Sequence, residues 1–132
     1  MKVAIVTDDG RTVSRHFGRA AHYAVLTVES GAIVARELRD KFSPHAMAAT
    51  VAHADVPGRP HGTDPASEAR HDQMAAAIAD CDYLICGGMG MGAYERMAAN
   101  GIRPVVTEIE DLETAALECA SGRIVDRVEL LH

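Results

Sequence analysis

The residues best suited to chemistry lie in two short glycine-containing stretches, R-H-F-G-R at 15–19 and G-G-M-G-M-G at 87–92. The first presents His16, and neutral imidazole is a common protein ligand of transition metals. In the second, glycine lets a ligand approach the backbone N–H groups closely. The helix expected to begin behind it carries a partial positive charge at its N-terminus. Together the two stretches predict an anion-binding site with His16 as a candidate metal ligand.

The region around His16 is basic, although the chain as a whole carries a formal net charge of −6. No acidic residue occurs between Gly10 and Val28, whereas five basic residues do: Arg11, Arg15, His16, Arg19 and His22. A local basic patch attracts anions. A solvated loop paired with acids elsewhere explains the same pattern. Phe17 could anchor this loop and Gly18 could let it bend, so that His16 is presented to a ligand.

The glycine-rich stretch also matches a dinucleotide-binding fingerprint. Residues 88–93 read G-x-G-x-x-A, and Glu108 follows Gly88 by twenty residues, where such sites place an acid on the ribose. This fingerprint normally belongs to the first strand of a larger sheet, and here a single firm strand follows it. A tight turn between a strand and a closely packed helix accounts for the same glycines.

Two further groups of residues are of the types that bind metals. Cys81 and Cys86 are five residues apart, which predicts opposite faces of a strand and no zinc cage. Cys86 adjoins the glycine loop and is a candidate thiolate ligand, whereas Cys119 is expected in the core. The loop histidines are spaced eight, eight and ten residues apart, without a chelating helical spacing: His45, His53, His61 and His71.

Asp8 and Asp9 end the first predicted strand, where they could hold Mg²⁺ or simply form a turn. The chain has no G-x-S-x-G and no Walker A motif. No convincing pair of nucleophile and base is apparent. The sequence therefore does not predict an enzyme.

The elements that must position these residues alternate in type along the chain. Its 132 residues, of which 48% are hydrophobic, indicate one globular α/β domain. We expect a mixed five-stranded sheet flanked by helices, with Pro104 placing its strand near an edge. The predicted strands are 3–7, 23–29, 32–38, 82–86 and 102–107, with 124–130 as a candidate last strand. The predicted helices are 64–80, 93–99 and 112–120, and a proline- and histidine-containing loop spans 42–67.

Composition also excludes several functional classes. The net charge argues against a nucleic-acid-binding protein. No apolar run approaches eighteen residues, so no membrane span is expected, and residues 1–9 read as a strand and turn rather than as a signal peptide. Three cysteines, an odd number, suggest reduced thiols in a cytoplasm.

Four segments together resemble the nitrogenase iron–molybdenum cofactor biosynthesis (accessory factor) domain family. These are M-K-V-A-I-V-T-D-D-G, V-S-R-H-F-G-R-A-A-H-Y, C-D-Y-L-I-C-G-G-M-G-M-G-A and A-N-G-I-R-P-V. The resemblance covers residues 1–38 and 74–122, whereas the loop at 42–68 does not fit it. It implies a ribonuclease H-like α/β fold and a small non-enzymatic carrier of a metal–sulfur cluster, either iron–sulfur or molybdenum-containing. His16, Gly88, Met89 and Gly90 match the positions that would contact the cluster.

The combined prediction is a loosely bound anionic cluster held between the two glycine-containing stretches. Its predicted contacts are Arg15, His16, Phe17, Gly18, Arg19, Gly88, Met89 and Gly90, with His16 and Cys86 as metal ligands. We expect cluster donor and acceptor proteins as partners and a monomer or weak dimer. The alternatives are an enzyme that binds a nucleotide or phosphate ester through residues 87–92 and Glu108, and an adaptor that binds proteins through residues 42–67.

Overall fold

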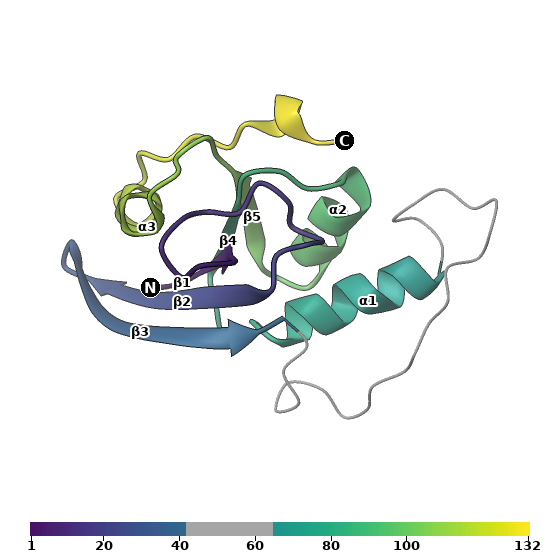
Figure 1. Cartoon of the computed structure of the whole chain (residues 1–132), viewed down its shortest axis with the longest axis horizontal. Helices are drawn as coiled ribbons and strands as arrows, with labels where there is room; N and C mark the ends of the chain where they lie inside the picture. The colour runs from purple at the N-terminus through teal and green to yellow at the C-terminus, as the bar shows by residue number, and fades with distance from the viewer. Residues whose placement is uncertain (42–64) are drawn as a thin grey trace.

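A five-stranded mixed sheet forms the centre of the protein. The computed structural model describes residues 1–41 and 65–132. The sheet order is β3-β2-β1-β4-β5. Strand β1 pairs antiparallel with β2 and parallel with β4, which in turn pairs parallel with β5 (Figure 1). This confirms the predicted mixed sheet, whose strands are β1 (Lys2–Thr7), β2 (His22–Glu29), β3 (Ala32–Asp40), β4 (Tyr83–Cys86) and β5 (Arg103–Val106).

Strand β1 is central because its side chains are apolar on both faces. Its residues from Val3 to Val6 are completely buried. Ala4 and Val6 belong to one core cluster, and Val3 and Ile5 belong to the other. A continuous apolar run of this kind is typical of a strand covered on both sides. Strand β5 lies at one edge, as Pro104 predicted, since proline cannot donate a ladder hydrogen bond.

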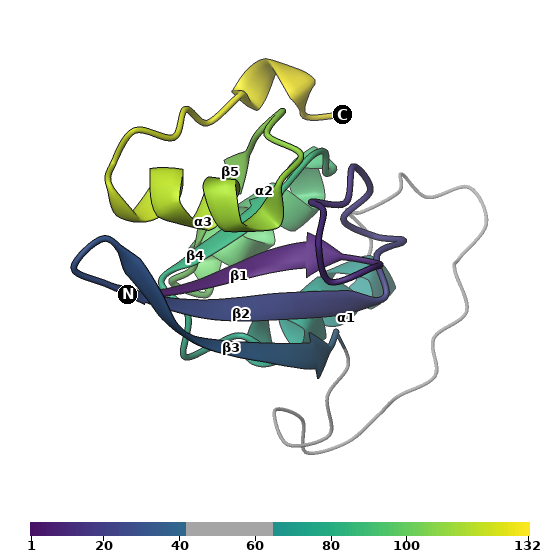
Figure 2. The ribbon, with the colours of Figure 1, turned by 60° about the vertical axis from the view of Figure 1, so that its left-hand side comes forward.

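Helices cover both faces of the sheet. Helices α1 (Pro65–Ala76) and α2 (Met91–Ala99) pack on one face, and α3 (Leu112–Ala120) packs on the other (Figure 2). Met74 and Met97 contribute to the first core cluster, and Leu112 contributes to the second. No helix among the described residues is both long enough and apolar enough to cross a membrane.

Strand β3 forms the other edge and is joined to the α1 side by Arg39. The β2–β3 pairing is irregular, with a register shift opposite Thr27 and Val28. Arg39 is 8% exposed, donates to both carboxylate oxygens of Asp80 at 2.7 and 2.9 Å, and donates to the Ala77 carbonyl oxygen at 3.1 Å. Its guanidinium holds the pKa of Asp80 well below the usual range. This ion pair therefore fixes the edge strand to the chain that follows α1.

Two details of the predicted elements are wrong. Residues 124–130 form no strand but end in a short 3-10 helix, η2 (Val128–Leu130). The helix predicted to reach residue 80 ends at Ala76. It begins at Pro65, next to its predicted start at residue 64. His45, His53 and His61 of the predicted loop lie outside the described residues.

The two cysteines near β4 do not lie on opposite faces. Cys81 precedes the strand, so strand alternation does not apply to it. Both Cys81 and Cys86 are buried in the core cluster beneath α1 and α2. Cys119 is buried in the opposite cluster, as predicted.

Candidate functional site

The candidate site lies at the carboxyl ends of the three parallel strands. The segments that follow β1, β4 and β5 meet there, at residues 8–21, 87–90 and 107–111. In open α/β sheets ligands commonly bind at this edge. Because β1 is central, the loop that contains His16 and the glycine loop open at the same place.

The loop that contains His16 (residues 8–21, the His16 loop) and the glycine-rich stretch at 87–92 (the glycine loop) are joined by backbone hydrogen bonds. The Gly87 N–H donates to the Ser14 carbonyl oxygen at 2.8 Å, and the Phe17 N–H donates to the Gly88 carbonyl oxygen at 3.0 Å. Ser14 also donates its N–H to Val6 at the end of β1. These bonds hold the two predicted parts of the site against each other.

This close contact explains two of the glycines. A Cβ on Gly88 would lie 2.6 Å from the Arg15 carbonyl oxygen, and one on Gly87 would lie 2.9 Å from the Arg15 Cα. The backbone that approaches them is the chain's own. In addition, the Met91 N–H at the start of α2 donates to a main-chain oxygen of His132 at 2.8 Å. The donors that a pyrophosphate would need are therefore partly occupied, which weighs against the dinucleotide interpretation.

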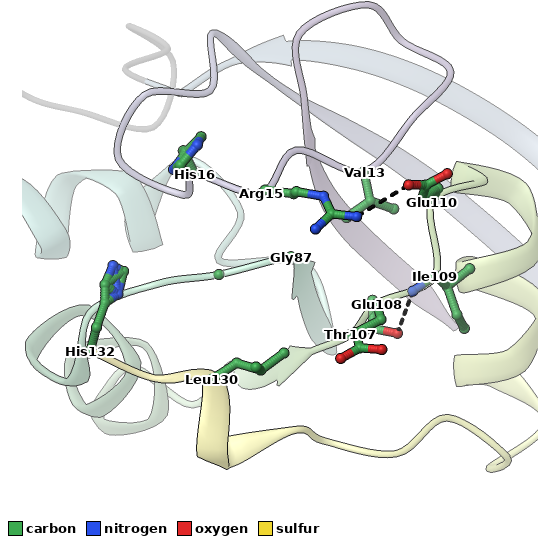
Figure 3. A pocket seen from close by; sticks show the side chains of 11 residues that line it. Val13, Arg15, His16, Gly87, Thr107, Glu108, Ile109, Glu110, Leu130 and His132 are labelled. Atoms are coloured by element: carbon green, nitrogen blue, oxygen red, sulfur yellow. Dashed lines mark hydrogen bonds and ion pairs between the residues drawn. The ribbon is translucent and has the colours of Figure 1, made fainter.

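Two adjoining cavities open at this edge. The first, of about 540 Å³, contains both acids and bases and is called the mixed cavity (Figure 3). Arg15 donates to Glu110 across it at 3.1 Å, and both side chains are exposed. Glu108 lies 3.7 Å from Arg127. The mixed cavity is lined by Val13, Arg15, His16, Gly87, Gly88, Thr107, Glu108, Ile109, Glu110, Leu130 and His132.

The second cavity, of about 420 Å³, brings together most of the predicted site and is called the basic cavity. Seven of the eight predicted contacts line it, and the eighth, Arg15, lines the neighbouring mixed cavity. All its ionisable side chains among the described residues are basic. The lining residues are His16, Phe17, Gly18, Arg19, Arg70, His71, Met74, Gly88, Met89, Gly90, Ala93 and His132.

Three basic residues of this cavity were not predicted as part of the site. Arg70 and His71 lie on α1, one turn before Met74, which also lines the cavity. Arg70, His71 and Met74 have the spacing of one helix face. This spacing could identify them as site residues only if α1 were already known to cover the site. His132 belongs to the segment after η2, and no spacing in the sequence connects it to His16.

Cys86 does not reach either cavity. Its side chain is completely buried, and burial raises the pKa of its thiol to about 12. A metal ligand must be the thiolate, which this environment disfavours. We therefore leave Cys86 out of the site.

The two aspartates at the end of β1 close loops. Asp9 accepts hydrogen bonds from the Arg11 and Thr12 N–H groups, both at 2.8 Å, and these bonds lower its pKa to about 2. Asp8 accepts from the Ala21 N–H at 3.0 Å. Turn formation thus accounts for the pair. Among the described residues no group of three His, Cys, Asp or Glu side chains is placed to hold one metal ion.

A buried lysine, Lys41, contacts the His16 loop at Phe17. Lys41 is 2% exposed, donates to the Phe17 carbonyl oxygen, and lies 4.4 Å from the centroid of the Phe17 ring. Burial, assisted by the nearby Arg70 charge, lowers the pKa of its amine to about 8, whereas Asp8 and Cys86 act in the opposite direction. The Lys41 amine, which contacts Phe17 of this loop, therefore loses its proton at a lower pH than an exposed lysine.

This lysine predicts a pH dependence of stability. In the unfolded chain the amine keeps its proton up to about pH 10, so the unfolded state binds more protons above pH 8 and stability rises with pH. We expect the unfolding free energy of the wild type to rise by about 1 kcal/mol relative to Lys41→Met between pH 8 and 9. Chemical denaturation at both pH values measures this difference.

The comparison with Lys41→Met is needed because three buried thiols act in the opposite direction. Burial raises the pKa of Cys81 and Cys86 to about 12 and that of Cys119 to about 11, so each thiol lowers stability as the pH rises above 9. They are present in both proteins and cancel. Identical pH profiles for the two proteins would show that the Lys41 amine is not perturbed.

Comparisons with known proteins agree with this architecture. A family model described as dinitrogenase iron-molybdenum cofactor matches residues 1–122. A comparison with curated proteins gives no match. Several solved structures have the same fold at low sequence identity.

Three of these structures illustrate the similarity. The apo orange protein from Desulfovibrio gigas has a TM-score of 0.64 at 17% identity, covering 95% of this chain and 91% of its own. A Thermotoga protein provisionally named NifB has a TM-score of 0.58 at 22% identity, with coverages of 95% and 91%. A Methanocaldococcus jannaschii protein provisionally named dinitrogenase has a TM-score of 0.60 at 13% identity, with coverages of 95% and 92%. At these identities the structures show the shared fold, whereas the family model covers more than nine tenths of the sequence. The chain therefore belongs to the dinitrogenase iron-molybdenum cofactor family.

Proposed function

We propose that this protein is a non-enzymatic carrier that binds an anionic metal–sulfur cluster in the basic cavity. The observation that carries the proposal is the cavity's lining, in which all ionisable side chains among the described residues are basic. Metal–sulfur clusters of this kind are anions, so such a lining complements their charge. The volume of about 420 Å³ falls within the range of small-ligand sites.

In this proposal the residues of the basic cavity have different roles. Arg19 and Arg70 supply positive charge, and His16 offers an imidazole for a direct bond to a metal of the cluster. Met89 and the Phe17 ring are buried and form an apolar wall. The cluster itself would be iron–sulfur or molybdenum-containing, and loosely held because the cavity is open to solvent.

The nucleotide alternative has weaker support. The Met91 N–H at the start of α2 is already bonded to His132, and the Glu108 side chain is paired with Arg127. Family membership gives no support to it either. We also propose that the carrier works in the cytoplasm, where its three buried thiols stay reduced, and exchanges its cluster with donor and acceptor proteins as a monomer or weak dimer.

The role of His16 is tested by His16→Ala. His16 is exposed and its side chain makes no hydrogen bond with another described residue, so its loss should leave the melting temperature nearly unchanged. We expect at least tenfold weaker binding of tetrathiomolybdate, a metal–sulfide dianion, measured by equilibrium dialysis with visible absorbance. Unchanged binding would remove His16 from the site.

The identity of the cargo requires the native protein. We would purify it anaerobically from its own host and record its visible spectrum, metal content and sulfide content. The proposal expects charge-transfer bands with stoichiometric iron or molybdenum. A colourless preparation that also fails to bind tetrathiomolybdate would contradict the carrier function and lead next to nucleotide-binding measurements.

A further inference from the structure

The chain after α3 passes the end of the edge strand β5 and is hydrogen-bonded to β5 and α2 next to the candidate site. The Arg127 N–H donates to the Val106 carbonyl oxygen at 2.7 Å, and the Val106 N–H donates to Asp126 at 2.9 Å. The Tyr94 hydroxyl donates to the other oxygen of Asp126 at 2.6 Å. Residues 126–132, here called the returning segment, lie beyond residues 1–122 that the family model matches.

The returning segment ends against the glycine loop. The His132 N–H donates to the Met89 carbonyl oxygen at 3.2 Å, and a main-chain oxygen of His132 accepts from the Met91 N–H at 2.8 Å. Leu131 packs against the core cluster on this face of the sheet. The backbone of His132 is therefore fixed on both sides, independently of its side chain.

The fixed backbone places the His132 imidazole where both cavities meet. His132 lines the mixed cavity and the basic cavity, as His16 does. Figure 3 shows the two imidazoles at the same end of the mixed cavity, carried by different segments of the chain. The segment thus occupies one N-terminal donor of α2 and contributes a basic side chain in its place.

We propose that His132 is a binding residue for the anionic metal–sulfur ligand and that the returning segment positions it at the two cavities. The proposal rests on the proposed function of the basic cavity. No three described His, Cys, Asp or Glu side chains can hold a single metal ion. His16, His71 and His132 would therefore contact different atoms of one larger ligand rather than chelate one ion.

The test is the tetrathiomolybdate affinity of His132→Ala in the full chain. The backbone bonds of His132 do not depend on its side chain, so we expect an unchanged melting temperature and at least fivefold weaker binding. Free imidazole added to His132→Ala should restore most of the affinity. The matched control is Val128→Ala, because Val128 is 53% exposed on the same segment and lines neither cavity.

Each outcome separates this inference from the proposed function. If the wild type binds and His132→Ala binds equally well, the inference is wrong and the carrier function stands. If affinity and melting temperature fall together and imidazole does not restore binding, the effect comes from altered packing and the inference is wrong. If the wild type itself does not bind the anion, the proposed function fails and the inference fails with it.

Discussion

Gly88→Ala is expected to destabilise the protein by about 2–3 kcal/mol and to weaken ligand binding at the same time. The added Cβ would lie 2.6 Å from the Arg15 carbonyl oxygen, which is backbone and cannot rotate away. The hydrogen bonds from Gly87 to Ser14 and from Phe17 to Gly88 hold the two loops at this separation. Relief of the contact must therefore move the loop that carries His16 and Arg19.

Gly18→Ala is the matched control for the predicted loss of stability, and not for binding, because Gly18 itself lines the basic cavity. Gly18 lies in the same loop, and a Cβ on it would meet no atom within 4 Å. We expect its unfolding free energy to stay within about 0.5 kcal/mol of the wild type. Urea denaturation and tetrathiomolybdate titration of both variants measure the two effects. Equal stability of Gly88→Ala and the wild type would show that the two loops are not in close contact.

The second large effect is expected from removing both arginines of the basic cavity. Arg19 comes from the His16 loop and Arg70 from α1, so together they bring positive charge from two separate elements. A hydrogen bond between an arginine and an anion contributes about 1.5 kcal/mol or more. The double variant Arg19→Ala/Arg70→Ala should therefore bind tetrathiomolybdate about a hundredfold more weakly than the wild type.

The salt dependence of binding provides an independent check. Screening weakens interactions between exposed charges, so the wild-type affinity should fall as the salt concentration rises and that of the double variant should fall less. Arg11→Ala serves as the control, because Arg11 is exposed beside the same loop and lines neither cavity. If Arg11→Ala weakens binding as much as the double variant does, overall charge rather than the cavity determines affinity.

The sheet could be predicted because local patterns determine it. The buried apolar run of β1 and the turn at Ser30 and Gly31, which both have positive φ, are determined by residues close in sequence. The same holds for Asp111, whose side chain accepts from the Thr114 N–H at 2.9 Å and begins α3. The combination of H-F-G-R with the glycine loop identified the family and the His16 side of the basic cavity. The ribonuclease H-like relationship and the boundaries of the long insertion stay predictions.

The remaining parts of the site depend on contacts that sequence spacing does not encode. Residues 124–130 contain β-branched residues typical of a strand, but Asp126 and Arg127 attach them to Val106 through isolated bonds. The contribution of Arg70 requires α1 to lie over the glycine loop, and that of His132 requires the returning segment. The glycines of the loop illustrate the same limit, since Gly88 accommodates Arg15 from another part of the chain.

The irregular pairing at Thr27 and Val28 affects self-association of the protein through the β3 edge of its sheet. Between those two residues the partner on β3 changes from Ala35 to Ile33, so Val34 is an extra residue in the outer strand. An extra residue bends the strand and interrupts the straight row of backbone donors and acceptors that a second sheet would need for docking. The charged side chains of Arg36 and Glu37 on the same strand oppose such stacking further. The outer strand β3 thus discourages pairing between the sheets of two molecules, and it lies apart from the candidate site at the carboxyl ends of β1, β4 and β5.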